Sequence, residues 1–357
     1  MKRFLKCTVT MLLLFAFCAA AFPGLRAEAA APEKIAADGE YTLFTMEVKG
    51  RQTDPAVMKI ESSLILNQDG TGKMAIYGME TALSKWTEKD GAVTLEAADG
   101  SSIEGKLEKG VLELEMGEGT YLYYAHEGVD TKDFKTDGHP TGSMLYAFFQ
   151  GIDPEKDVHL RYTRHTDYLN ADTDFDTQAR DNGLYSLSRI KVSGHESESA
   201  KLLKDGVYYA LEPASKTATV VMEGSLTELV NVNVLLLDDF YSAMWEQVMR
   251  TDYTAEEREL DGVKYKAEVF PIKPGEEEYG QEMTFYFNDK GELVHIVQGA
   301  SKLLPDMGET AYTLTGLDDK VDEKLFDLTG YKIERLNLDD LTSQRSDSKE
   351  AEPETKK

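Results

Sequence analysis

Residues 260–297 read LDGVKYKAEVFPIKPGEEEYGQEMTFYFNDKGELVHIV, and this stretch decides the fold class. Over 263–269 apolar side chains alternate with charged ones, which is the period of a β-strand with one buried face. Met283, Phe285 and Phe287 share one side of a second run, and a glycine turn leads into a third. The stretch therefore predicts a long antiparallel meander. Because its buried face carries large apolar groups, we expect a second layer or a bound apolar molecule to cover it.

Residues 1–30 have the layout of a cleaved secretory signal. A basic start at 1–6 precedes an apolar run at 9–22 and then small residues. The run is shorter than the roughly 20 residues that a bilayer span needs. We therefore expect the protein to be secreted or to lie on the extracellular face of the cell envelope, with no stable membrane span. Lipid attachment at Cys18 stays open, although Phe17 stands where a lipoprotein signal has a small residue.

Composition narrows the class of protein further. Both cysteines, Cys7 and Cys18, lie in the signal, so the mature chain must be stabilised by its core and not by disulfides. With 357 residues, 41% of them apolar, the chain is long enough for two globular domains. Its formal net charge of −26 repels phosphate backbones and anionic lipid headgroups. The composition predicts no nucleic-acid partner.

The first domain is expected over residues 31–128. Glycine-bearing turns recur there about every ten residues, and short β-rich runs lie between them. Such spacing is typical of an all-β meander, and closing the meander removes its exposed edges. We predict a small antiparallel β-barrel.

Four motifs mark this region: Gly39-x-Tyr41, Leu64-x-Leu66-Asn67-x-Asp69-Gly70-Thr71-Gly72, Trp86 with Gly91-x-Val93-x-Leu95, and Tyr121-x-Tyr123-Tyr124. Together they resemble the lipocalin-like β-barrel modules of exported Gram-positive bacterial proteins. The resemblance implies a closed barrel. Tyr41 stands where the first strand of true lipocalins carries tryptophan, so the small-ligand binding of lipocalins does not transfer to this chain.

Residues 129–140 are polar and rich in turn formers, which predicts a linker. The second domain is expected over residues 141–336. In it, apolar residues at helical spacing predict helices at 142–151 and 238–250. We expect strands at 158–163, 184–192, 200–203, 207–211 and 217–222, followed by the meander. The segment 226–237 fits either a strand or a buried helix. Residues 337–357 are charged and nearly free of apolar side chains, and they predict a disordered acidic tail.

This order of elements ends in the motif Val321-Asp322-x-x-Leu325-Phe326-Asp327. Over 142–331 the chain resembles the LolA-like lipoprotein-carrier superfamily, in which helices lid a half-open barrel. The resemblance implies an α+β second domain, a half-open antiparallel sheet with helices on its concave face. The whole protein is then expected to be mainly β.

No motif for catalysis or metal binding stands out. The sequence contains neither Gly-x-Ser-x-Gly nor His-Glu-x-x-His, and its carboxylates are too numerous to single out a pair. The acidic run 170–176 fails the EF-hand pattern at Thr177 and Gly183, so we predict a solvated loop. His159 and His165 would share one strand face about 20 Å apart, too far to share an ion, and we expect both at the surface. We predict no catalytic residue, no metal ligand and no cofactor.

Large apolar side chains of the expected helix and meander would converge if the helix lies on the sheet. Such a convergence is either an ordinary core or a site for an apolar ligand. We predict a non-catalytic binding protein for a lipid, another apolar ligand or an acylated protein. The alternative is a cell-envelope protein-interaction module with solid cores and no small ligand. The predicted ligand-binding residues are Phe240, Met244, Trp245, Met283, Phe285 and Phe287.

Overall fold

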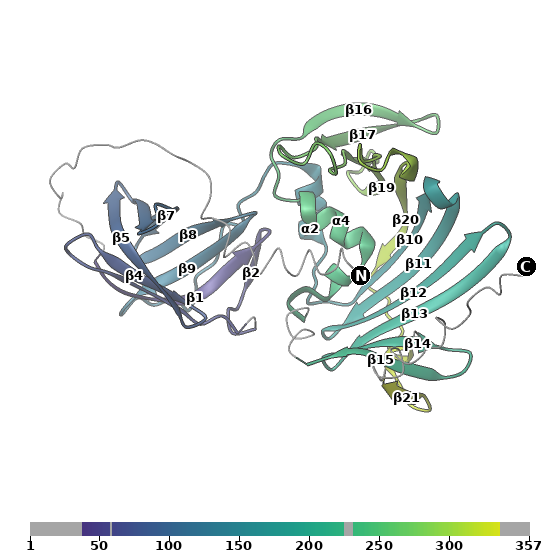
Figure 1. Ribbon diagram of the computed structural model, residues 1–357, viewed down its shortest axis with the longest axis horizontal. Coiled ribbons are helices and arrows are strands. Elements are labelled where there is room, and N and C mark those ends of the chain that lie inside the picture. The colour runs from purple at the N-terminus through teal and green to yellow at the C-terminus, as the bar shows by residue number, and fades with distance from the viewer. Residues whose placement is uncertain (1–37, 58, 225–230, 336–357) are drawn as a thin grey trace, which may run out of the picture. The chain divides into compact units, whose positions relative to one another are not determined.

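The computed structural model describes residues 38–57, 59–224 and 231–335 (Figure 1). The predicted signal at 1–30, with Cys18, and the predicted tail at 337–357 lie outside the described residues. The chain divides into two compact units, Met1–Pro140 and Thr141–Lys357. Among the described residues, no helix is both long and apolar enough to cross a bilayer.

The first unit is an antiparallel β-barrel, and this prediction is confirmed. Its strands pair in chain order, and the first strand pairs with the last to close the barrel. A short strand β2 (Arg51–Thr53) pairs antiparallel with the last three residues of β1. The closed barrel consists of β1 (Gly39–Val48), β3 (Ser62–Leu66), β4 (Gly72–Ile76), β5 (Met79–Lys89), β6 (Ala92–Ala97), β7 (Ser102–Glu108), β8 (Val111–Gly117) and β9 (Thr120–His126).

Alternation along the strands fills the barrel with apolar side chains. Leu112, Leu114 and Tyr124 are fully buried, and Trp86 donates its Nε1–H to the carbonyl of Asn67 at 2.9 Å. The tight turns follow from residues that tolerate a left-handed backbone. At the β5–β6 turn, for example, Asp90 and Gly91 have φ of 53° and 83°, the pair of positive angles that a type I′ hairpin requires.

The second unit is a twelve-stranded sheet in the order β16-β17-β18-β19-β20-β10-β11-β12-β13-β14-β15-β21. Neighbouring strands run antiparallel except for β15 and β21, which are parallel. The strands are β10 (Val158–Thr166), β11 (Ala171–Arg180), β12 (Gly183–Val192), β13 (His195–Lys204), β14 (Val207–Glu212), β15 (Thr217–Glu223), β16 (Thr254–Leu260), β17 (Val263–Phe270), β18 (Met283–Phe287), β19 (Leu293–Gln298), β20 (Thr310–Asp318) and β21 (Lys332–Arg335).

Short helices lie in the hollow of this curved sheet (Figure 1). They are the α-helices α2 (Met144–Gly151) and α4 (Asp239–Gln247) and the 3₁₀ helix η2 (Asn231–Leu237), and the core packs them against the sheet. The prediction of an antiparallel sheet with helices on its concave face is confirmed. Three more 3₁₀ turns lie in loops: η1 (Asp167–Leu169), η3 (Pro305–Met307) and η4 (Glu323–Phe326).

The acidic run at 170–176 was predicted as a solvated loop, and this is wrong, because it forms most of β11. Thr173 and Thr177 point inward and are buried, whereas the aspartates alternate with them on the outer face. There Asp174 accepts a hydrogen bond from the Thr163 hydroxyl at 2.9 Å. Partners on the neighbouring strands make an acidic strand stable.

The histidines of β10 also have aspartate partners on β11. His165 lies 2.8 Å from Asp172, and His159 lies 3.0 Å from Asp176. The prediction of two surface histidines is wrong for His159, which is buried. Its imidazole can be buried because it has a carboxylate partner.

The predicted buried face of 263–269 is correct for Ala267 and Val269, which are buried, but wrong at Val263 and in leaving Glu268 on the wet face. Val263 is 50% exposed, whereas Glu268 is buried and shares the core face with Phe270, whose strand register pairs them with Phe285 and Met283. A charged residue is tolerated on this face because backbone amides of α2 donate to it, as described below. The predicted face of β18, with Met283, Phe285 and Phe287 together, is in the core.

Candidate functional site

The structure brings the six predicted ligand-binding residues together. Helix α4 supplies Phe240, Met244 and Trp245, and β18 supplies Met283, Phe285 and Phe287. All belong to or pack against one core between the helices and the concave face, and only Trp245 among them is partly exposed. Their role as ligand-binding residues stays a prediction.

Aromatic rings that are not among the six predicted ligand-binding residues complete this core. Phe149 of α2 has its ring centre 5.3 Å from that of Tyr241 and 5.8 Å from that of Trp245. Phe270 meets Phe285 edge to face at 5.3 Å. Offset and edge contacts of this kind stabilise aromatic pairs. Helical spacing predicts Tyr241 on the same apolar face of α4 as Phe240 and Met244, although it is not among the six predicted ligand-binding residues.

The apolar concave face extends beyond the residues that the helices cover completely. Phe175 of β11, Tyr208 of β14 and Leu314 of β20 pack against the core but stay partly exposed. The ring of Phe175 stacks on Tyr162 at 4.7 Å, and the Arg164 guanidinium lies 5.1 Å from the Phe175 ring centre. Apolar surface therefore remains accessible on the concave face.

Asp238 is a carboxylate inside this core. It caps α4 by accepting from the amides of Phe240 and Tyr241, at 3.0 and 3.3 Å. Its other oxygen accepts from the hydroxyls of Thr177 at 2.6 Å and Tyr162 at 3.1 Å. Burial raises the pKa of Asp238 to about 6. The same hydrogen bonds that satisfy this carboxylate fix the start of α4 on the sheet.

Glu268 does the same for α2. Its two oxygens accept from the amides of Met144 at 2.6 Å and Leu145 at 3.0 Å. Burial raises the pKa of Glu268 above its ordinary value. Both helices are thus held on the sheet at their N-terminal ends, where the helix dipole favours negative charge.

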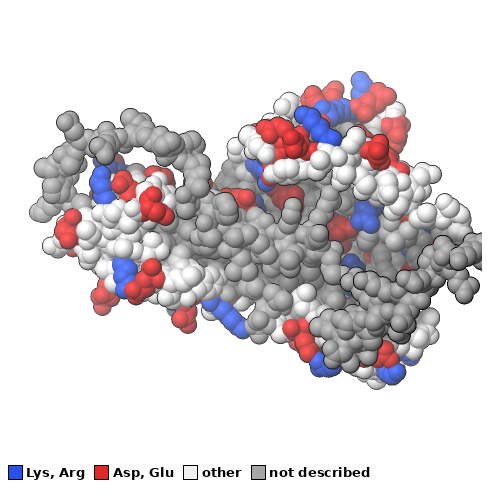
Figure 2. Space-filling view, in the orientation of Figure 1, with Lys and Arg blue, Asp and Glu red and all other residues white. Residues whose placement is uncertain are grey.

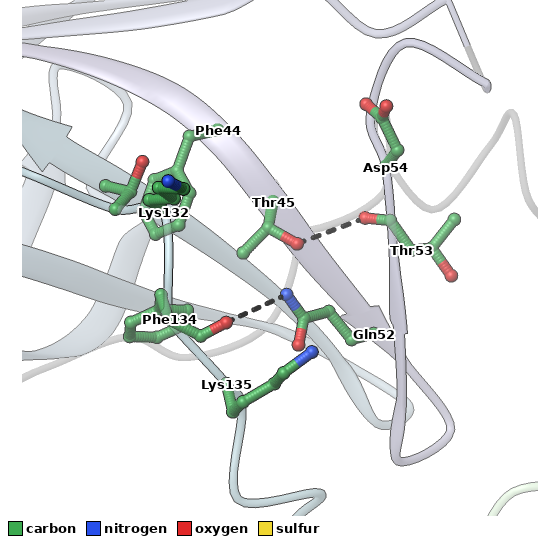
Figure 3. A pocket seen from close by; sticks show the side chains of 9 residues that line it. Phe44, Thr45, Gln52, Thr53, Asp54, Lys132, Phe134 and Lys135 are labelled. Carbon is green, nitrogen blue, oxygen red and sulfur yellow. Dashed lines mark hydrogen bonds between the residues drawn. The ribbon is translucent and has the colours of Figure 1, made fainter.

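Two hollows on the surface lie elsewhere, and neither is lined by any of the six predicted residues. One, of about 470 Å³, lies on the outer face of the second sheet and includes His165, Arg258 and Thr284 among its lining residues. The other, of about 340 Å³, lies on the first unit beside Phe44 and Gln52 (Figure 3). Figure 2 shows acidic side chains over both units on the face drawn, with basic ones among them.

No family model and no curated protein matches the sequence. Solved structures are similar to about half of it. LprF from Mycobacterium bovis is 13% identical and covers 50% of this chain and 93% of its own, with a TM-score of 0.32. The Mycobacterium tuberculosis lipoprotein LppX is 15% identical over 50% of this chain and 97% of its own (TM-score 0.29). A LolA superfamily protein from Nitrosomonas europaea is 12% identical over 53% and 97% (TM-score 0.21). Identities and TM-scores this low say nothing about what this chain does.

Proposed function

We propose that the second unit is a non-catalytic binding domain for an apolar ligand, such as a lipid or an acyl chain. The ligand would lie between the helices and the concave face of the sheet. The protein would act outside the cell or at the extracellular face of its envelope, as the sequence of residues 1–30 predicts.

The observation that carries the proposal is the mismatch between the sheet and its helical cover. Twelve strands spaced about 4.8 Å apart make a sheet on the order of 50 Å across. Helices α2, α4 and η2 have eight, nine and seven residues, so each is only about 12 to 14 Å long, and the α-helices are about 10 Å wide. Phe175, Tyr208 and Leu314 accordingly remain partly exposed on the concave face. A single solid core would bury such side chains.

The composition of the core suits an adaptable ligand. Met244 and Met283 are unbranched and can change rotamer to fit a chain that slides between α4 and β18. Each methylene buried there contributes about 0.8 kcal/mol. The N-terminal ends of α2 and α4 would stay anchored by Glu268 and Asp238, so the C-terminal ends, near Trp245, are where we expect the helices to move.

Trp245 is the reporter that tests this. Titration of the full chain with a monomeric long-chain lipid should shift the tryptophan emission, because Trp245 lies at the rim of the core. A Trp245→Phe variant is the control: its remaining tryptophan, Trp86, is buried in the barrel and should not respond. Mass spectrometry of protein purified from its own host should find bound lipid. Absence of bound lipid together with no shift for any lipid class would contradict the proposal.

A second candidate function, contact with an envelope protein, has its own supporting observation. Loops at one end of the second sheet are tied together: the Asp167 amide donates to the carbonyl of Glu309 at 3.1 Å, and the Leu303 amide to that of Glu278 at 2.7 Å. Clustered exposed apolar side chains are typical of interaction surfaces. These loops expose Tyr168, Leu169, Tyr279, Leu303, Leu304 and Met307.

Charge substitution tests this second function. A Leu303→Asp, Leu304→Asp double variant should lose a partner that is cross-linked to the wild-type protein in its host, without losing the Trp245 response. If the double variant is cross-linked to the same proteins as the wild type, these loops are not the contact surface.

A further inference from the structure

A cluster of titratable side chains lies on the outer face of the first unit. Glu47 of β1 is fully buried, and Glu113 lies on β8, which is separated from β1 by β9. The segment 131–140, which passes over these strands, adds Asp137 and His139. The donor atoms of Glu47, Asp137 and His139 lie within 4.8 Å of one another.

The segment 131–140 is packed onto the barrel. Phe134 lies with its ring centre 5.1 Å from that of Phe44 and 5.2 Å from that of Tyr123, and its carbonyl accepts from the side chain of Gln52 (Figure 3). The His139 ring stacks on Tyr121 at 3.5 Å with an angle of 3° between the planes. These contacts hold His139 in one position above Glu47.

The hydrogen-bonding capacity of the imidazole does not match its surroundings. His139 Nε2 lies 3.4 Å from Glu113 Oε1, whereas Nδ1 lies 2.7 Å from Glu47 Oε1 and 3.2 Å from Asp137 Oδ1. A neutral imidazole carries one N–H. Whichever ring nitrogen carries it, the other turns a lone pair toward carboxylate oxygen: toward Glu113 if Nδ1–H donates to Glu47, or toward both Glu47 and Asp137 if Nε2–H donates to Glu113. A cation at Nδ1, either a second proton or a metal ion, removes the repulsion in the second case.

We propose that this cation is a divalent transition-metal ion, with Zn²⁺ the best match, bound by His139 Nδ1, Glu47 Oε1 and Asp137 Oδ1. Metal bonds of about 2.0 to 2.2 Å place neighbouring ligand atoms roughly 3 to 3.5 Å apart. The 3.2 Å between Nδ1 and Asp137 Oδ1 lies in this range, whereas the 2.7 Å between Nδ1 and Glu47 Oε1 would have to lengthen when an ion binds. One imidazole with carboxylates suits Zn²⁺, which binds such donors more tightly than Mn²⁺ or Fe²⁺.

Two further contacts fit this assignment. Glu113 on Nε2 would orient the imidazole, as carboxylates commonly do for metal-bound histidine. The hydroxyl of Tyr123 lies 3.4 Å from the second oxygen of Glu47 and donates to it. Asp137 is 73% exposed, so water can complete the coordination on that side. Since Glu47 and His139 are 92 residues apart in sequence, the ion would clip the segment 131–140 to the barrel.

Metal content tests the proposal. The full chain is stripped with a chelator, dialysed against Zn²⁺ and analysed for bound zinc per chain by mass spectrometry. We expect His139→Gln and Asp137→Asn to bind one zinc fewer than the wild type. His165→Gln, which removes a half-exposed histidine paired with Asp172, should bind as many as the wild type. Because Asp137 is mostly exposed, its variant will fold even if a change at buried Glu47 does not.

A second readout follows the segment itself. Zn²⁺ should slow tryptic cleavage after Lys132 and Lys135 about tenfold or more in the wild type and leave the rate in His139→Gln unchanged. Equal zinc content in the wild type and in both variants would overturn the proposal. The cation between Nδ1 and the two carboxylates would then be a second proton on His139.

Discussion

The hydroxyl of Tyr162 donates to the carboxylate of Asp238 across 3.1 Å, inside the core between β10 and α4. Both side chains are buried, and burial raises the pKa of each. Because Asp238 caps α4, the protonation state of its carboxylate affects how strongly α4 is held on the sheet.

This linkage has a definite sign. The pKa of Asp238 is about 6 in the folded protein and 3.8 ordinarily, so the folded state holds the proton more tightly. The contribution of Asp238 to the free energy of unfolding is fully present below pH 3.8 and is lost as the pH rises through 6. Relative to Asp238→Asn, the wild type should lose about 3 kcal/mol of unfolding free energy as the pH rises from 3.5 to 6.5. Urea unfolding over this range measures the difference.

Asp318 provides a control of opposite sign. Hydrogen bonds from the Lys320 amide and the Arg161 guanidinium lower the pKa of Asp318. The contribution of Asp318 to the free energy of unfolding is present above the ordinary pKa of an aspartate and is lost as the pH falls through the folded-state pKa. Asp318→Asn should therefore reduce the loss of stability in acid. If Asp238→Asn leaves the pH dependence unchanged, the carboxylate does not titrate as its burial requires.

Glu268, which lies on β17, should stabilise the attachment of α2 to the sheet. In Glu268→Ala the amides of Met144 and Leu145 lose their acceptors inside the protein, which we expect to cost about 1 to 3 kcal/mol. Glu268→Gln keeps one acceptor oxygen and should cost less. Glu257→Ala, an exposed change on neighbouring β16, should stay within about 0.5 kcal/mol of the wild type. Equal urea midpoints for all four proteins would show that Glu268 does not hold the helix.

Local patterns were sufficient to predict much of the fold. Aspartate and glycine at 90–91 predict a hairpin because only a few residues adopt two successive positive φ angles at low cost. Met283, Phe285 and Phe287 were placed on one face because a strand alternates with period two. These signals depend on residues next to one another in the chain, which the sequence shows directly.

Other placements depend on partners far away in the chain. Glu268 points inward because amides 123 and 124 residues earlier donate to it, although alternation alone puts a charged side chain outside. The aspartates of β11 lie in a strand because Thr163 and the histidines of β10 face them. His139 lies close to Glu47, although it belongs to a segment whose polar composition predicts a linker. No pattern within either segment reveals the other.

The two units should unfold separately. Trp86 donates to the Asn67 carbonyl at 2.9 Å inside the barrel, so Trp86→Phe should lower the melting temperature of the barrel only. Calorimetry of the full chain should resolve two transitions, one of which moves in the variant. In the absence of Zn²⁺, trypsin should cut after exposed Lys132 or Lys135 and leave two folded fragments. A single transition that moves as a whole would mean that the domains proposed for 31–128 and 141–336 are not independent.

Truncation of Phe285 distinguishes most directly between a ligand site and an ordinary solid core. Its side chain is fully buried against Phe270, and truncation of such a residue to alanine costs about 3 to 5 kcal/mol in a solid core. If the space between α4 and β18 opens to admit a ligand, a bound lipid fills part of the cavity, and the truncation should cost less when lipid is present. Phe285→Ala should also weaken the lipid-induced shift of Trp245 fluorescence.

Phe326 is the matched control, because it lies in a separate cluster with Tyr185 and Leu202 on the other face of the sheet. Phe326→Ala should lower stability by a similar mechanism, yet leave the Trp245 response intact and gain nothing from lipid. A loss of stability in Phe285→Ala that lipid does not reduce, with a Trp245 response equal to that of Phe326→Ala, would mean that the core is solid. The exposed loops around Leu303 would then be the better candidate for the functional surface.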